Sequence, residues 1–92
     1  MITQEELARH TGDLDMWMAL DDKQTGKTLV FDISKFAQFH PGGFEVLKEF
    51  AGKNATEAYM KAHPFVSLKM IEKLRVGYLQ TVKFLNSVIC YA

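Results

Sequence analysis

The chain of 92 residues has the length of one small domain. Hydrophobic residues make up 48% of it and charged residues 24%, which is ordinary for a globular protein and excludes a disordered or fibrous class. The 11 basic residues balance the 11 acidic residues, so a broad phosphate-binding surface is excluded and we expect no nucleic acid partner. Because so short a chain lies near the lower limit for a self-sufficient core, a bound cofactor would help it to fold.

The ends of the chain and its one cysteine bear on the cellular compartment. Cys90 allows no internal disulfide, which favours a reducing compartment. The first ten residues lack the basic start and the apolar run of a secretory signal. Residues 79–92 form the most apolar terminal stretch, but this stretch includes Lys83 and Asn86 and is shorter than the roughly 20 apolar residues of a spanning helix. We therefore expect a soluble, cytoplasmic monomer without a membrane span.

The first third of the chain predicts a short helix followed by a hairpin. Thr3 precedes Glu5 and Glu6 as an N-cap precedes acids in a first turn, which predicts a helix over residues 4–10. Apolar and β-branched runs predict strands over residues 16–20, with Trp17, and over residues 28–33. The polar stretch between these strands, residues 21–27, contains Gly26 and predicts the turn.

Helical spacing of apolar residues replaces the strand pattern from Ser34 onward. Ser34 is expected to cap the first of three helices, which are predicted over residues 34–39, 44–51 and 55–62. Pro64 is expected to begin a fourth helix, whose apolar stripe contains Val66, Met70, Ile71 and Leu74. Residues 76–79 return to an extended pattern. Two pairs of helices are thus predicted to flank a gap.

The domain is expected to cover residues 1–80, with a C-terminal tail over residues 81–92. In that tail Val82, Leu85, Val88 and Ile89 could line one face of a last helix. We find no internal repeat, linker or low-complexity segment in the sequence. One domain is therefore the simplest organisation.

The segment His40-Pro41-Gly42-Gly43 has the residue types of a binding site. Pro41 stops the preceding helix, and the two glycines permit a tight turn and the close approach of a flat, bulky group to the backbone. His40 is therefore expected to project from a helix end. A second histidine, His63, follows 23 residues later, again before a proline and again at the junction of two predicted helices.

Apolar and aromatic side chains surround both histidines and could wall a flat apolar ligand. They are Phe36, Phe39, Phe44, Val46, Leu47, Phe50, Tyr59, Phe65, Met70 and Leu74. Two neutral imidazoles on opposite faces of a haem fill both axial positions, so that such a site exchanges electrons and offers no open position. Each imidazole would donate its other ring N–H to a nearby loop carbonyl. A C-x-x-C-H attachment motif is absent from the sequence, which predicts a haem held without thioether bonds.

The sequence resembles the cytochrome b5 family of haem-binding domains over residues 3–79. The resemblance runs through ELARH near the N-terminus, Trp17, VFDISKF at residues 30–36, HPGG at residues 40–43, AGKNATE at residues 51–57, and His63. It implies an α+β fold in which a small mixed sheet supports two helical hairpins that enclose a haem cleft.

The resemblance also implies a site and a function. It implies one b-type haem with His40 and His63 as axial ligands, and Pro41, Gly42 and Gly43 at the mouth of the pocket. The implied pocket lining is Phe36, Val46, Leu47, Tyr59, Met70 and Leu74. The family moves electrons between reductases and oxidative enzymes, so we expect an electron carrier rather than an enzyme, with a flavin reductase as donor and an oxidative enzyme as acceptor.

Three features depart from the family pattern. Pro64 stands where the family usually has a serine whose hydroxyl and N–H hold a haem propionate, and proline offers neither group. The stretch of residues 21–27 looks longer than the usual loop. The acidic ring of microsomal members is replaced by mixed charges, which predicts weak docking to a basic protein such as cytochrome c. These charges are Glu45, Glu49, Glu57, Lys48, Lys53, Lys61 and Lys69.

Other interpretations stay open from the sequence. The chain could be a haem-binding or haem-sensing module that modulates partners without rapid electron exchange, although the two histidines favour transfer. It could be a domain separated from a larger oxidoreductase. The aromatic residues could form only a core, which would not explain HPGG, and zinc would need closer spacings than those among His10, His40, His63 and Cys90. His10 is expected to be a helix-end residue and Trp17 a packing residue.

Overall fold

The computed structural model describes residues 1–64 and 67–80 and contains a four-stranded sheet. The strands are β1 (Thr11–Gly12), β2 (Asp15–Asp22), β3 (Lys27–Asp32) and β4 (Arg75–Tyr78), in that order across the sheet. Every neighbouring pair is antiparallel, which corrects the predicted mixed sheet. Short connections from β1 to β2 and from β2 to β3 allow only antiparallel neighbours. Parallel pairing within the described residues is confined to the isolated bridges Ile2–Leu79 and Ala19–Asn54.

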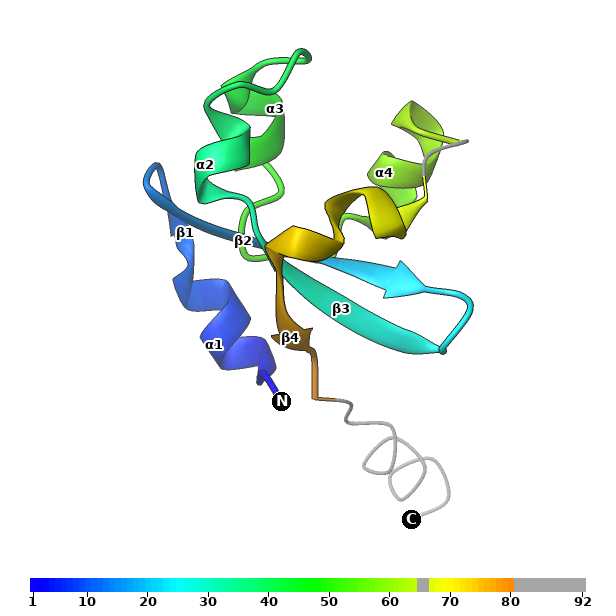
Figure 1. Ribbon diagram of the computed structural model, residues 1–92. Helices are drawn as coiled ribbons and strands as arrows, with labels where there is room; N and C mark the ends of the chain where they lie inside the picture. The colour runs from blue at the N-terminus through cyan, green and yellow to red at the C-terminus, as the bar shows by residue number, and fades with distance from the viewer. Residues whose placement is uncertain (65–66, 81–92) are drawn as a thin grey trace.

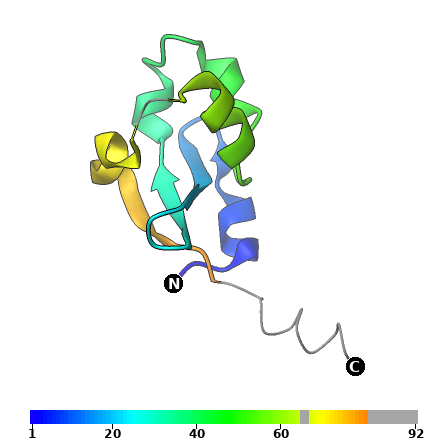
Figure 2. The ribbon, with the colours of Figure 1, turned by 90° about the vertical axis from the view of Figure 1, so that its right-hand side faces the viewer.

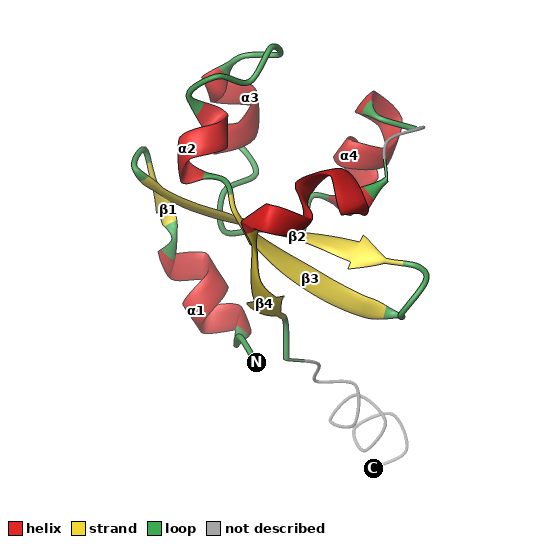
Figure 3. Cartoon of the chain, in the orientation of Figure 1, coloured by secondary structure: helices red, strands yellow, loops and turns green. Residues whose placement is uncertain are grey.

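The helices lie on both sides of the sheet. They are α1 (Gln4–Arg9), α2 (Ser34–Ala37), α3 (Phe44–Lys48), α4 (Thr56–Ala62) and the 3₁₀ helix η1 (Leu68–Leu74). Figures 1 and 3 show the pairs α2–α3 and α4–η1 on one side of β2 and β3, with α1 on the other side. Figure 2 shows α2, α3 and α4 at one end of the molecule and the N-terminus at the other. The α+β architecture with two helical hairpins is therefore confirmed.

Alternation along β2 and β3 divides the core between the two faces of the sheet. The larger cluster, packed with residues of both helix pairs, includes Met16, Met18, Leu20, Leu29 and Phe31. The smaller cluster joins α1 to the opposite face through Leu7, Ala19 and Val30, with Trp17 packed against it. The sheet thus forms an apolar floor for the two helix pairs.

The caps of the first two helices show one prediction confirmed and one wrong. Thr3 caps α1 through its Oγ1, which accepts the N–H of Glu6 at 3.0 Å. The predicted side-chain cap at Ser34 is wrong, because its Oγ accepts the N–H of Met16 at 2.9 Å instead. The same hydroxyl donates to Asp32 at 2.6 Å. Ser34 therefore ties the start of α2 to the sheet.

The connections also differ from the predicted ones. The hairpin strands extend to Asp22 and from Lys27, so the turn is residues 23–26 and is shorter than expected. The fourth helix starts at Leu68 rather than Pro64 and has 3₁₀ geometry, with a non-helical backbone at Ile71. The predicted tail helix lies outside the described residues, and the division at residue 80 stays a prediction. Within the described ranges, the helices are too short or too polar to cross a bilayer.

Candidate functional site

His40 is held in place by the turn that joins α2 to α3. Gly43 adopts φ 101°, a left-handed conformation that other residues resist. This conformation places its carbonyl to accept the Nδ1–H of His40 at 3.2 Å, while its N–H donates to the His40 carbonyl at 2.9 Å. With Nδ1 acting as the donor, the lone pair of Nε2 is left for a metal ion.

Gly42 makes room for the imidazole itself. A Cβ at this position would lie 2.8 Å from Cε1 of His40, closer than real contacts allow. The sequence suggested that the bare glycines admit a flat ligand. In the structure Gly42 lines the pocket and also lets the His40 ring lie against the backbone, and Gly43 provides the turn.

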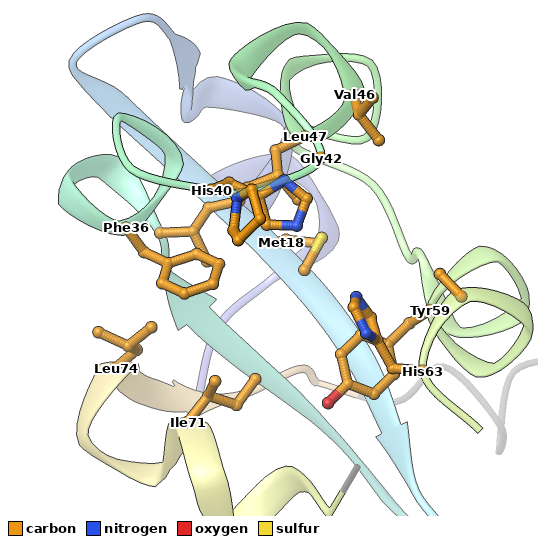
Figure 4. Close-up of a pocket in the computed structure, with 13 residues that line it drawn as sticks. Met18, Phe36, His40, Gly42, Val46, Leu47, Tyr59, His63, Ile71 and Leu74 are labelled. Atoms are coloured by element: carbon orange, nitrogen blue, oxygen red, sulfur yellow. The ribbon is translucent and has the colours of Figure 1, made fainter. Parts of the chain in front are cut away.

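His63 faces His40 from the other helix pair. It ends α4, where its backbone N–H donates to the Tyr59 carbonyl at 2.8 Å, and its ring centroid lies 5.2 Å from that of Tyr59. The centroids of the two imidazoles are 6.4 Å apart, with an angle of 76° between the ring planes. Figure 4 shows the two rings approaching each other across the pocket.

This spacing fits one metal ion between the histidines. Imidazole binds a transition metal at about 2 Å, which places the centroids of two opposed rings about 6 Å apart. The observed 6.4 Å agrees with that value. The donor set also fits, because neutral imidazole nitrogen is an axial ligand of haem iron. Within residues 1–64 and 67–80 we find no group of three or more histidine, cysteine, aspartate or glutamate side chains that could hold a metal ion, so the zinc interpretation gains no support there.

An apolar pocket of about 360 Å³ surrounds the two histidines. Its floor is formed by Met18 of β2 and by Ile33, which directly follows β3, and its walls come from both helix pairs (Figure 4). A smaller lobe of about 70 Å³ shares both histidines and continues along α3 and α4 past Phe50, Ala55 and Ala58. A flat apolar group held between the imidazoles would therefore contact mainly apolar side chains.

Most of the predicted site residues meet in this pocket. Those that line it are Phe36, His40, Pro41, Gly42, Val46, Leu47, Tyr59, His63 and Leu74. Gly43 and Met70 do not line it, and Gly43 acts through its backbone as described above. Met70 is 77% exposed because a 3₁₀ helix has three residues per turn, so Ile71 and Leu74 share a face and Met70 is turned away from it.

Sequence reasoning missed four residues of the lining. They are Met18, Ile33, Ala62 and Ile71. Met18 lies on the same face of β2 as Met16 and Leu20, and the alternation of residues along a strand could have predicted this from the sequence. The apolar stripe predicted for the fourth helix already contains Ile71 with Met70 and Leu74, but it does not separate the three. The 3₁₀ geometry of η1 puts Ile71 and Leu74 toward the pocket and Met70 away from it.

Tyr59 brings a polar group into these apolar surroundings. Its hydroxyl is buried and has no hydrogen-bond partner among the described residues. Burial raises the pKa of this phenol above its usual value, so at neutral pH it is a hydrogen-bond donor. Beside His63 there is thus a buried hydroxyl that makes no hydrogen bond to the described part of the chain.

His10 and Trp17 lie outside the pocket lining. Their rings stack with centroids 3.6 Å apart and planes 8° apart, and His10 Nδ1 lies 2.6 Å from a carboxylate oxygen of Asp15. Trp17 packs against the smaller core cluster. His10 therefore has a packing role at the end of α1.

A family model described as "Cytochrome b5-like Heme/Steroid binding domain" matches residues 3–80. The chain belongs to the cytochrome b5 family. It is accordingly a haem-binding domain of an electron-transfer family, and its cofactor is haem b. The sequence resemblance and the predicted cofactor are confirmed by this match.

Individual relatives agree with the family match. The chain is 37% identical over 86 residues to cytochrome b5 of Candida tropicalis, covering 92% of this chain and 62% of that protein. It is 36% identical over 81 residues to an NADH-cytochrome b5 reductase-like protein of Emericella nidulans, covering 87% of this chain and 17% of that protein. The solved cytochrome b5 of Ostreococcus tauri virus 2 matches with a TM-score of 0.73 and 32% identity, covering 87% of this chain and 84% of that one. The chain thus spans less than two thirds of these two curated relatives.

Proposed function

We propose that this domain carries single electrons on one b-type haem whose axial ligands are His40 and His63. The observation that carries the proposal is the pair of imidazoles that face each other at 6.4 Å in an apolar pocket. The hydrogen bond from His40 Nδ1 to the Gly43 carbonyl supports it, because this bond leaves Nε2 free to bind iron.

Different residues of the chain would have different roles in holding the cofactor. A bound haem supplies one-electron exchange between its ferric and ferrous states. His40 and His63 would occupy both axial positions, which leaves none for a substrate. Phe36, Leu47 and Leu74 would exclude water from the ring faces and edges. In this proposal Ile71 replaces Met70 among the contacts.

The proposed partners are a flavin reductase as donor and an oxidative enzyme as acceptor. The Emericella relative is a reductase-like protein, and a Delta(8)-fatty-acid desaturase of Arabidopsis thaliana is 32% identical over 77 residues. These relatives support a carrier role, in which the domain itself catalyses no reaction. A monomer in the cytoplasm remains our prediction for the assembly and the compartment.

The test is an absorption spectrum of the purified protein with added haem, before and after reduction by dithionite. We expect a sharp Soret band and resolved α and β bands on reduction, and we expect His40→Ala and His63→Ala each to lose this six-coordinate spectrum. Asp15→Ala, which removes a carboxylate from His10 outside the pocket, is the control and should keep it. A high-spin spectrum that does not respond to His63→Ala would overturn the carrier proposal in favour of a haem-binding interaction module.

A further inference from the structure

The segment AGKNATE at residues 51–57 is part of the family resemblance, but most of it lies outside the pocket. Within it only Ala55 lines the smaller lobe, and none of its residues lines the larger pocket. The segment leads into α4, the helix that ends at His63. Its polar side chains therefore do not line the haem pocket, and their hydrogen bonds indicate another role.

A continuous line of backbone hydrogen bonds runs from the sheet to His63. The Ala55 N–H donates to the carbonyl of Ala19 in β2 at 2.8 Å. The carbonyl of Ala55 accepts the N–H of Tyr59 at 2.9 Å, and the carbonyl of Tyr59 accepts the N–H of His63 at 2.8 Å. Figure 1 shows α4 starting beside the sheet and pointing away from it. A change in the direction of its first turn is therefore carried to His63 at its other end.

A network of side-chain hydrogen bonds surrounds the start of this line. The amide oxygen of Asn54 accepts the N–H of Thr56 at 2.9 Å and also accepts the Thr56 hydroxyl. The amide nitrogen of Asn54 donates to the carboxylate of Asp21 at 2.9 Å, and the same oxygen accepts the Thr28 hydroxyl at 2.8 Å. The Asp21 N–H donates to the Thr56 hydroxyl oxygen at 2.8 Å. The first residue of α4 is thus tied to both β2 and β3.

Apolar packing holds α4 only in part. The helix contains no buried residue, and it packs against the larger core cluster through Tyr59, which is partly buried. The described residues provide no hydrogen-bond partner for the His63 ring. The bonds at the start of α4 are therefore a main determinant of its direction.

We propose that Asp21, Asn54 and Thr56 are positioning residues for the axial ligand His63. They set the direction of α4, and this direction sets the plane of the His63 imidazole. The proposal rests on the proposed electron-carrier function, because it concerns an axial ligand of the haem. Asn54 is central to it, since its oxygen bonds to α4 while its nitrogen bonds to β2. A ligand outside the pocket lining is thus controlled by contacts on the sheet.

The experiment exchanges the two facing polar groups. Asn54→Asp keeps the oxygen that accepts from α4, but it replaces the amide donor with a carboxylate oxygen that faces Asp21. Asp21→Asn keeps an oxygen that can accept from Asn54. The double variant, Asp21→Asn with Asn54→Asp, again places a donor opposite an acceptor. A recovery in the double variant would therefore identify this one contact as the cause.

The matched control is Asp22→Ala, at the next residue of the same strand. The Asp22 carboxylate accepts from the Gln24 N–H at 3.1 Å and from the Thr25 hydroxyl at 2.9 Å, both in the hairpin turn. This variant also removes a carboxylate with two hydrogen bonds, but these bonds do not reach α4. It separates a loosened hairpin from a displaced helix.

Two properties of the ferric, haem-loaded protein are measured. The g-values of electron paramagnetic resonance report the orientation of the axial imidazoles, and transfer to apomyoglobin gives the rate of haem loss. Asn54→Asp should change the g-values and raise the rate of haem loss by about three- to tenfold, because a like-charge contact replaces one hydrogen bond. Asp21→Asn, the double variant and Asp22→Ala should stay within about twofold of the wild type and keep its g-values.

Three results would overturn the proposal. The first is a set of g-values and a rate of haem loss that Asn54→Asp leaves unchanged. The second is an equal change in Asp22→Ala, which would trace the effect to the hairpin. The third is a double variant that does not recover, because the contact between residues 21 and 54 would then not be responsible.

Hydrogen exchange in the haem-free protein separates this proposal from the proposed function. Asn54→Asp should speed exchange of the Tyr59 and His63 amides by about three- to tenfold, and the double variant should restore the wild-type rates. A wild type without a six-coordinate haem spectrum would refute the electron-carrier proposal, and the exchange rates would still show whether the network holds α4. Unchanged exchange in Asn54→Asp would overturn the role of the network.

Discussion

The helix pairs α2–α3 and α4–η1 each present one histidine to the pocket, but they hold it in different ways. His40 donates to the Gly43 carbonyl at 3.2 Å and lies against Gly42, where a Cβ would clash with the ring. Across the pocket, the ring of His63 makes no hydrogen bond to the described part of the chain. Its close ring neighbour is Tyr59, at 5.2 Å.

The helix pair that holds its histidine more firmly is also the more deeply buried pair. Ala37 of α2 and Leu47 of α3 are buried, whereas α4 and η1 contain no buried residue. Because apolar burial is the main source of stability, segments with less of it open more easily. We therefore infer that the His40 side is formed by the chain itself and that the His63 side gains more of its order when haem binds.

The largest expected effect is a difference between the two ligand variants. His40→Ala should weaken haem binding by more than about 100-fold, because it removes the ligand that is already oriented. His63→Ala should cost about tenfold less, because His40 can still bind the iron. Transfer of haem to an excess of apomyoglobin measures both rates of loss. A greater loss in His63→Ala would reverse the comparison.

The turn at Gly43 can be tested against a matched glycine. Gly43 and Gly26 both have positive φ, 101° and 75°, and a Cβ added at either position would have no neighbouring atom within 4 Å. Alanine at either position should therefore cost about 1–2 kcal/mol of backbone strain. Only Gly43→Ala should also disturb the bond to His40, and so raise the rate of haem loss by about tenfold. Equal haem retention in the two variants would show that this carbonyl does not position His40.

A smaller effect is expected from the hydroxyl of Tyr59 on the His63 side. In the haem-free protein this buried group lacks a partner among the described residues, so Tyr59→Phe should raise the free energy of unfolding by about 1 kcal/mol. Tyr78→Phe, at a residue that is 38% exposed, is the control and should change little. Urea unfolding followed by circular dichroism measures both. A loss of stability in Tyr59→Phe would mean that the hydroxyl has a partner.

The smallest effect is expected at alkaline pH. Burial raises the pKa of Tyr59 above its ordinary value of 10.0, so the folded protein keeps this proton at a pH where the unfolded chain releases it. The associated stability is complete below pH 10 and is lost as pH rises through the folded pKa. The haem-free wild type should therefore lose more stability between pH 9 and about pH 11 than Tyr59→Phe does. Parallel losses would show that the phenol titrates normally.

The sequence was most informative where local backbone chemistry decides the structure. Pro41, Gly42 and Gly43 restrict the turn so strongly that the projection of His40 could be predicted without tertiary information. The apolar and β-branched runs of residues 16–20 and 28–33, with the polar stretch between them, likewise predicted the hairpin. These features depend on neighbours in the chain.

The predictions failed where tertiary contacts choose between similar local structures. Ser34 has the residue type of an N-cap, but the N–H of Met16 competes for its hydroxyl. Met70 and Ile71 are both apolar, and only the 3₁₀ geometry of η1 decides which one faces the pocket. These two failures therefore fall one on each side of the pocket, at positions where contacts distant in the sequence or the type of helix decide the outcome.

The most direct test of the central claim is electron paramagnetic resonance of the ferric, haem-loaded protein with ¹⁵N-labelled histidine. Two imidazoles on one iron predict a low-spin signal with hyperfine couplings from two histidine nitrogens, and loss of one coupling in His63→Ala. A high-spin signal in the wild type, or coupling to a single histidine nitrogen, would contradict the assignment of His40 and His63 as the axial pair.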